Sequence, residues 1–315
     1  MSSLSMATRR RLTGKLANKD VRDNIEYYLM MLIPFALIFI FSYLPLFGLV
    51  IAFQDYTAGK PFIGEGVKWV GFKHFIKFTN SYYFTRILKN TIVLNLMNLA
   101  MGFWVPVVFA LTVNEIKFSK FRKFTQTVSY MPNFISSVVV VGMVLSFIAN
   151  DGIITQMLNA MGFNVKSLNA NAAAFPWIYT LTNVWKSFGW SSILYLSSIT
   201  SIDPALYESA DIDGATRLQK IWSVTLPFML PLIIIQLILA IGNMLSSNTE
   251  MVLLMYNSAV YSTADVIGTY VYRESLLGAK YSYGTASGLI LSLMSFVLVF
   301  IANAISRRTT DFSLW

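Results

Sequence analysis

Long apolar segments separated by shorter polar ones dominate the pattern of this sequence. Six runs carry almost no charged side chain, and they cover residues 27–53, 91–113, 128–149, 176–200, 227–247 and 285–306. A helix of about 20 residues crosses the roughly 30 Å hydrocarbon core of a bilayer, so each run is long enough to span a membrane. Pro34 and Pro45 are expected to bend the first run. The pattern therefore predicts an all-α polytopic membrane protein with six transmembrane helices.

Composition and charge placement support this interpretation and orient the chain. Hydrophobic residues make up 56% of the chain and charged residues 12%, which excludes an ordinary soluble domain. Lysine and arginine are concentrated in the tail 1–26, the loop 114–127 and the tail 307–315, whereas the loop 151–175 has a single lysine. By the positive-inside rule, both termini are expected in the cytoplasm and the transmembrane domain extends over 27–306. The basic loop 54–90 is an exception, but longer loops count for less. These loops explain the net charge of +9 without a nucleic-acid partner.

The loop 203–227 is expected on the cytoplasmic side, and its residues predict a folded structure. Asp203 is a suitable N-cap, and Pro204 follows at the first helical position, where a missing N–H costs nothing. Gly214 is able to adopt a positive φ and end a short helix. Residues 216–224 form a second helical pattern before Pro227. We therefore expect a compact helix–turn–helix on the membrane surface.

The same loop resembles the EAA motif of permease subunits in bacterial ABC importers. The matching positions are Glu208, Ala210, Gly214, Leu226 and Pro227, and the departures are conservative, at Ser209 and Val224. In that family the loop forms a coupling helix that docks on a cytoplasmic ATPase. The resemblance implies that the coupling residues here are Tyr207, Glu208, Ser209, Ala210, Asp211, Asp213 and Gly214. The alternative is an amphipathic loop lying on lipid headgroups.

The resemblance extends over nearly the whole chain. Blocks such as YLPLFGLVIAFQDY, TVSYMPNFISSVVV and ADVIGTYVYRESLL are similar to the LplB/YteP branch of carbohydrate permeases, which is related to the maltose and glycerol-phosphate permeases. The resemblance implies a type I importer permease in the bacterial inner membrane that transports an oligosaccharide, often one containing uronates. It also implies a second homologous permease subunit, two cytoplasmic ATPase subunits that carry the ATP and magnesium, and an extracytoplasmic solute-binding protein.

Polar residues within the predicted spans are the candidates for a substrate path. Lys186 is the one strongly charged residue in any span, so it should face protein or water rather than lipid. Helical spacing places Asn183, Lys186 and Trp190 on one side of the fourth span, with Ser187 beside them. An indole, an amide and an ammonium suit a sugar that bears a carboxylate. Further candidates are Asn243, Ser247 and Tyr283. A structural role for Lys186, bonded to helix carbonyls or to the partner subunit, stays open.

Several classes of function lack the residues they require. The sequence has no G-x-x-x-x-G-K-[ST] motif, so this chain is not itself the ATPase. Without cysteine and with a single histidine, it offers almost nothing for a metal site or a nucleophilic triad. An ion-coupled secondary sugar transporter is the main alternative, but that class commonly uses carboxylates in mid-membrane, and no predicted span contains one. The sequence therefore favours a transport subunit with no catalytic activity and no cofactor of its own.

Overall fold

The computed structural model describes residues 24–25, 27–165, 167–245, 248–310 and 312–314, and these residues form two compact units divided after Gly71. The first unit contains one continuous helical run, Tyr27–Phe53, which matches the first predicted span. Within it, the backbone forms a π turn, η1 (Phe39–Tyr43), and then a 3-10 segment, η2 (Leu44–Phe53). Pro45 lies at the start of η2, where it lacks the N–H that a regular helix would use.

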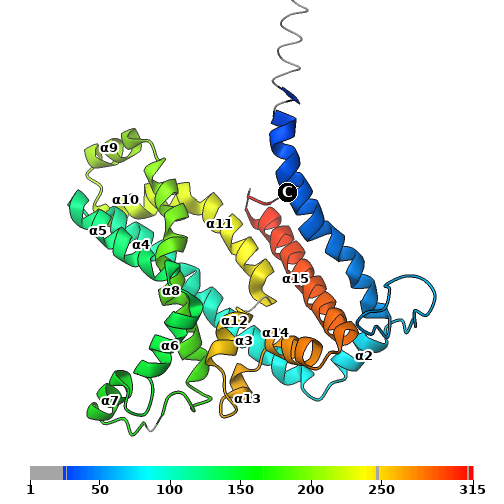
Figure 1. Ribbon diagram of the computed structural model, residues 1–315. Helices are drawn as coiled ribbons and strands as arrows, with labels where there is room; N and C mark the ends of the chain where they lie inside the picture. The colour runs from blue at the N-terminus through cyan, green and yellow to red at the C-terminus, as the bar shows by residue number, and fades with distance from the viewer. Residues whose placement is uncertain (1–23, 26, 166, 246–247, 311, 315) are drawn as a thin grey trace, which may run out of the picture. The chain divides into compact units, whose positions relative to one another are not determined.

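All the secondary-structure elements described in the second unit are helices (Figure 1). Its elements, in order, are α2 (Lys73–Thr79), α3 (Phe84–Gly102), α4 (Trp104–Asn114), α5 (Ser119–Tyr130), η3 (Met131–Phe134), α6 (Ser137–Phe147), α7 (Ile153–Ala160), α8 (Phe175–Thr200), α9 (Pro204–Ile212), α10 (Arg217–Lys220), η4 (Ile221–Thr225), α11 (Leu226–Gly242), η5 (Asn243–Leu245), α12 (Thr249–Met255), α13 (Tyr261–Ala264), α14 (Ile267–Val271), η6 (Tyr272–Leu277) and α15 (Tyr281–Thr309). Helix α8 is central, because α3 and α4 pack along it and α5, α6 and α11 also contact it.

Three of the predicted spans of this unit correspond to longer helices than the sequence pattern indicated. Phe84–Asn114, Arg217–Leu245 and Tyr281–Thr309 are long and apolar enough to cross a membrane. The fourth predicted span matches α8, which has 26 residues and would be about 39 Å long at 1.5 Å per residue. Helix α8 is long enough to cross a membrane, but it is less apolar than the four helices of the described residues that combine length with high apolarity. By length and apolarity alone the described chain thus offers four spanning helices, or five with the bent pair described next, rather than six.

The third predicted span, 128–149, is not one straight helix. The helix axis bends by 99° away from a straight line between the segments Ser119–Phe134 and Ser137–Phe147. Pro132 lies in the last turn before this break, where its ring and missing N–H interrupt the helical hydrogen bonds. Ser136 then caps the second helix by accepting a hydrogen bond from the Val139 N–H at 3.4 Å. The apolar pattern was right, but the prediction of a single helix was wrong.

Three apolar clusters hold the second unit together. One joins α4, the second half of α8 and α11, and a second joins α6, the first half of α8, α12 and α13. The third joins α2, the start of α3, α14 and α15 around the fully buried Phe78. Large side chains on the outside of α15, such as Phe296 and Phe300, are more than half exposed. Such faces are expected where a helix meets lipid or another membrane helix.

Candidate functional site

The helix–turn–helix predicted at 203–227 is present. The Asp203 carboxylate accepts a hydrogen bond from the Ala205 N–H at 2.9 Å and caps α9, whose first residue is Pro204. Gly214 ends this arm with φ +73°, a conformation that side chains with a Cβ rarely adopt. Thr216 then starts the second arm with a reciprocal capping box. The second arm differs from the prediction in one respect, because it continues without interruption into the long helix Arg217–Leu245.

Polar contacts fix the two arms against each other. The Lys220 ammonium lies 2.7 Å from the Asp211 carboxylate, and the hydroxyl groups of Tyr207 and Thr225 lie 2.8 Å apart. At the turn, Ile212 is 87% exposed and lies between the exposed side chains of Asp211 and Asp213. Helices α9 and α10 lie at one end of the second unit, and α7 and α13 lie at the other (Figure 1). A preformed hairpin with an exposed apolar side chain at its turn has the features of a docking surface, because its ordering cost is met before a partner binds.

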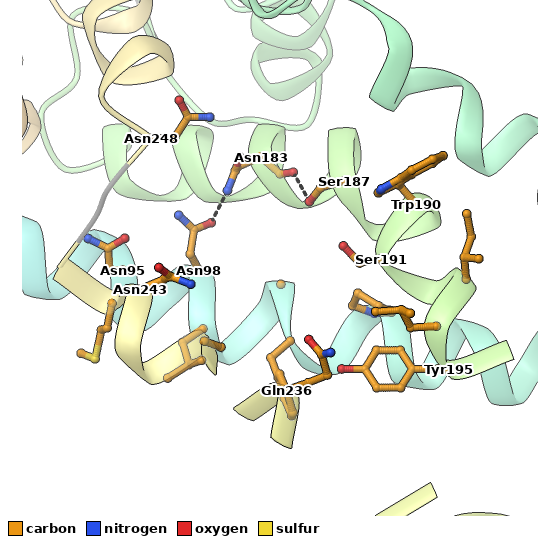
Figure 2. A pocket seen from close by; sticks show the side chains of 18 of the residues that line it. Asn95, Asn98, Asn183, Ser187, Trp190, Ser191, Tyr195, Gln236, Asn243 and Asn248 are labelled. Atoms are coloured by element: carbon orange, nitrogen blue, oxygen red, sulfur yellow. Dashed lines mark hydrogen bonds between the residues drawn. The ribbon is translucent and has the colours of Figure 1, made fainter. Parts of the chain in front are cut away.

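A cavity of about 770 Å³ lies between α3, α8 and the α11–η5 segment (Figure 2). Carboxamides dominate its polar lining: Asn95, Asn98, Asn183, Gln236, Asn243 and Asn248. Hydroxyl and indole groups complete it, from Tyr179, Ser187, Ser191, Tyr195 and Trp190. Among the residues that the structure describes, no charged side chain lines it. The volume is within the range of about 300–1,000 Å³ that is usual for ligand pockets.

Helical periodicity explains how these side chains converge. On α8, residues 183, 187, 190 and 191 recur at the spacing of one helical face. Asn98 of α3 and Asn183 of α8 point toward each other in Figure 2, and the Asn183 Nδ2 donates to the Asn98 Oδ1 at 3.1 Å. Ser187 donates to the backbone carbonyl of Asn183 at 2.8 Å. Because a carboxamide both donates and accepts, this wall is suited to neutral hydroxyl groups.

The structure separates the residues that were predicted as a substrate path. Asn183, Ser187, Trp190 and Asn243 all line the cavity. Ser247 lies outside the described residues. Tyr283 is buried elsewhere, with its hydroxyl 3.0 Å from that of Tyr270, and it does not line the cavity.

Lys186 does not line the cavity either, although it is one helical turn from residues that do. Its ammonium donates to the backbone carbonyl of Asn133, at 3.2 Å, in the break of the third span. Two neighbours on α8 contact the helical segment before this break, Ser119–Phe134. A Cβ at Gly189 would overlap the backbone of Ser129, and the Trp190 ring meets Phe134 edge-on with centroids 5.5 Å apart. The position of Lys186 thus matches the alternative in which it bonds a helix carbonyl.

Sequence reasoning missed part of the cavity wall. Asn95 and Asn98 in the second span and Gln236 in the fifth all line the cavity, and none was selected. The signal was available, because polar amides inside apolar spans usually face other helices or a water-filled space. Among the residues that the structure describes, no group of three or more His, Cys, Asp or Glu side chains could hold a metal ion.

Comparisons with known proteins agree with these features. Residues 104–311 match the family described as "Binding-protein-dependent transport system inner membrane component". The chain is 39% identical over 305 residues to the polygalacturonan/rhamnogalacturonan transport system permease protein YteP of Bacillus subtilis (strain 168), and the match covers 95% of this chain and 92% of that protein.

Two solved structures are also similar to this chain. One is a bacterial ABC transporter involved in the import of the acidic polysaccharide alginate, with a TM-score of 0.83, 40% identity, and 93% of this chain and 98% of that chain covered. The other is a bacterial alginate ABC transporter in complex with an alginate pentasaccharide-bound periplasmic protein, with a TM-score of 0.84, 39% identity, and 94% and 99% covered. The resemblance seen in the sequence is therefore confirmed, and this chain belongs to the family of inner membrane components of binding-protein-dependent transport systems.

Proposed function

We propose that this chain forms half of the translocation path of an ATP-driven oligosaccharide importer. The observation that carries this proposal is the amide-lined cavity between α3, α8 and α11, because it offers hydroxyl-binding groups inside helices that are otherwise apolar. Sugars present many hydroxyls and apolar C–H faces, which suit carboxamides and the half-exposed indole of Trp190. The names of the similar proteins support an oligosaccharide cargo, and the two alginate transporters support an acidic one.

The assembly we propose follows from the family. A second homologous permease would supply the other half of the path, two cytoplasmic ATPase subunits would hydrolyse ATP, and an extracytoplasmic binding protein would deliver the cargo. The periplasmic protein bound to the similar alginate transporter supports the last of these partners. The placement of lysine and arginine supports a transmembrane domain over 27–306 with both tails in the cytoplasm, which would put the α9–α10 hairpin on the ATPase side.

Uptake by the reconstituted complex tests the cargo and the cavity together. Proteoliposomes that contain this chain, the second permease and the ATPases, supplied with the binding protein, should take up trigalacturonate when ATP is present, and liposomes without this chain should not. Replacing Asn183 by leucine removes two hydrogen-bonding groups from the cavity and should reduce uptake about tenfold, the effect of losing roughly 1.4 kcal/mol. A complex that hydrolyses ATP but imports no acidic oligosaccharide would contradict the proposed cargo.

The α9–α10 hairpin is proposed to couple transport to the ATPase. A proline at Gly214 is incompatible with φ +73°, since proline holds φ near −65°, and Glu208→Lys reverses an exposed charge on α9. The double variant Glu208→Lys/Gly214→Pro should insert and pair normally while cargo-stimulated ATP hydrolysis falls sharply. Asp151→Lys, an exposed charge reversal outside the hairpin, serves as the control. Normal stimulated hydrolysis by a well-expressed double variant would exclude the coupling role.

A further inference from the structure

A second pocket, of about 500 Å³, opens where α3 begins. It is lined by Tyr82, Tyr83, Arg86 and Lys89 from the α3 end and by Ser262 and Thr263 of α13. Helix α13 lies at the end of the second unit opposite α9 (Figure 1), and therefore on the outer side of the membrane in the proposed orientation. None of the described residues that line this pocket is acidic. It is the basic and aromatic counterpart of the neutral cavity described above.

The positive charge at this pocket exceeds the negative charge behind it. Asp265, with a side chain only 1% exposed, receives two hydrogen bonds from the Arg273 guanidinium at 3.2 and 3.0 Å and one from Thr269 at 2.9 Å. Burial acts to lower the pKa of Arg273, but the hydrogen bonds and charge of Asp265 outweigh this effect, and the pKa is raised. Arg273 and Asp265 thus neutralise each other.

Arg86 is a second cation on the same carboxylate, at the longer distance of 3.6 Å. Its Nε is buried and has no hydrogen-bond partner within the described part of the chain. One turn further along α3, Lys89 is exposed and forms no ion pair with any described residue. Arg273 and Arg86 therefore share a single carboxylate, Lys89 adds a third positive charge, and the surplus charge of Arg86 and Lys89 faces the pocket.

Aromatic rings lie beside this surplus charge. Tyr82 is 91% exposed and meets Tyr83 edge-on, with ring centroids 5.4 Å apart. The Arg86 guanidinium stacks over the Tyr83 ring at 5.1 Å, which fixes its plane while its charge stays available. A ligand that carries a carboxylate on a ring with apolar C–H faces would use both features. A uronate sugar is such a ligand.

We propose that the pocket formed by Tyr82, Tyr83, Arg86 and Lys89 is an outer subsite that binds a carboxylate-bearing sugar of the cargo. This inference rests on the proposed function, in which the cargo is an acidic oligosaccharide. It also resolves a mismatch, because the described lining of the amide-lined cavity has no cation to meet a uronate carboxylate. Charge is thus recognised at the outer pocket, and hydroxyl groups are recognised in the membrane.

Direct binding tests the subsite independently of transport. The complete permease–ATPase complex is placed in phosphatidylcholine nanodiscs without binding protein, and saturation-transfer NMR gives the dissociation constants of trigalacturonate and its methyl ester. Lys89→Gln should raise the constant for trigalacturonate about two- to fivefold, the range for one exposed ion pair, and leave that for the ester unchanged. Lys89→Arg keeps the charge and should bind like the wild type. Lys120→Gln, which removes an exposed cation on α5, should have no effect.

Each other outcome overturns the proposal. An unchanged constant for Lys89→Gln and Arg86→Gln would show that the pocket does not bind the carboxylate. Equal losses for trigalacturonate and its ester would show that the contact is not with a charge. If phosphatidylglycerol in the nanodiscs abolishes the effect of Lys89→Gln, the pocket holds a lipid phosphate instead. A failure of the proposed function would be distinct, since uptake of trigalacturonate by the intact importer would then be absent whatever these variants show.

Discussion

Replacing Lys186 by methionine is expected to loosen the bend of the third span without changing cargo selectivity. The Lys186 ammonium donates to the Asn133 carbonyl at 3.2 Å, close to the end of the helical segment Ser119–Phe134. Carbonyl groups at a helix C-terminus carry partial negative charge, so a cation there is stabilising. Methionine is unbranched like lysine and only one atom shorter, and it removes both the charge and the donor. The variant therefore isolates the polar contact from the packing.

The expected magnitude follows from the type of contact. A hydrogen bond to a charged group contributes about 1.5–3 kcal/mol, which corresponds to an increase of about ten- to a hundredfold in the population of more open bends. Gly189 and Trp190 still hold the segment before the break against α8 in the variant, so the bend should remain the major state. Lys186→Arg retains a charged donor and should resemble the wild type.

Distance measurements across the bend report this change directly. The natural chain has no cysteine, so Phe124→Cys and Phe147→Cys, both at exposed positions, place one spin label on each arm. With a bend of 99°, the two Cα atoms are about 22 Å apart, and a straight helix would separate them by about 35 Å at 1.5 Å per residue. Lys186→Met should add a longer component to the distribution measured by double electron–electron resonance.

Transport assays then separate the two roles considered for Lys186. If it supports the bend, Lys186→Met should reduce uptake of trigalacturonate and of its methyl ester by the same factor. A loss confined to the acidic cargo, with an unchanged distance distribution, would refute the reasoning and assign Lys186 to the cargo carboxylate instead.

Two further predictions concern packing and the buried ion pair. Gly189→Val should destabilise the contact between α5 and α8 by about 1–3 kcal/mol, because its side chain overlaps backbone, and should lower the thermal unfolding temperature in detergent. Gly288→Ala, where a Cβ meets no atom within 4 Å, is the control, and equal stability of the two variants would contradict the overlap. Asp265→Ala should cost about 1–3 kcal/mol, since it leaves the Arg273 guanidinium, which is only partly exposed, without its carboxylate. If Asp265→Ala/Arg273→Met is no more stable than Asp265→Ala, the uncompensated charge is not the cause.

Local sequence was sufficient to predict the hairpin at 203–227. The cap at Asp203, the helix start at Pro204 and the positive φ at Gly214 all depend on one residue and its immediate neighbours. These preferences act over a single helical turn, so they persist in the folded chain. Apolar run length likewise determined the helical class and located most of the long helices, because lipid leaves the backbone no alternative to internal hydrogen bonds.

The tertiary structure decided which side chains meet. Hydropathy does not distinguish a straight span from the 99° bend in the third one, since both bury the same apolar residues. Periodicity correctly placed Asn183 and Lys186 near one another on α8. Only the packing of α3 and α5 against α8 determines that the Asn183 amide contacts Asn98 in the cavity and that the Lys186 ammonium donates to the Asn133 carbonyl. The outer pocket depends on contacts between α3 and α13, which are more than 170 residues apart in the chain, such as the hydrogen bond from Asn90 to the Ser262 carbonyl. Such long-range contacts leave no local signal in the sequence, because no residue in either segment specifies its distant partner.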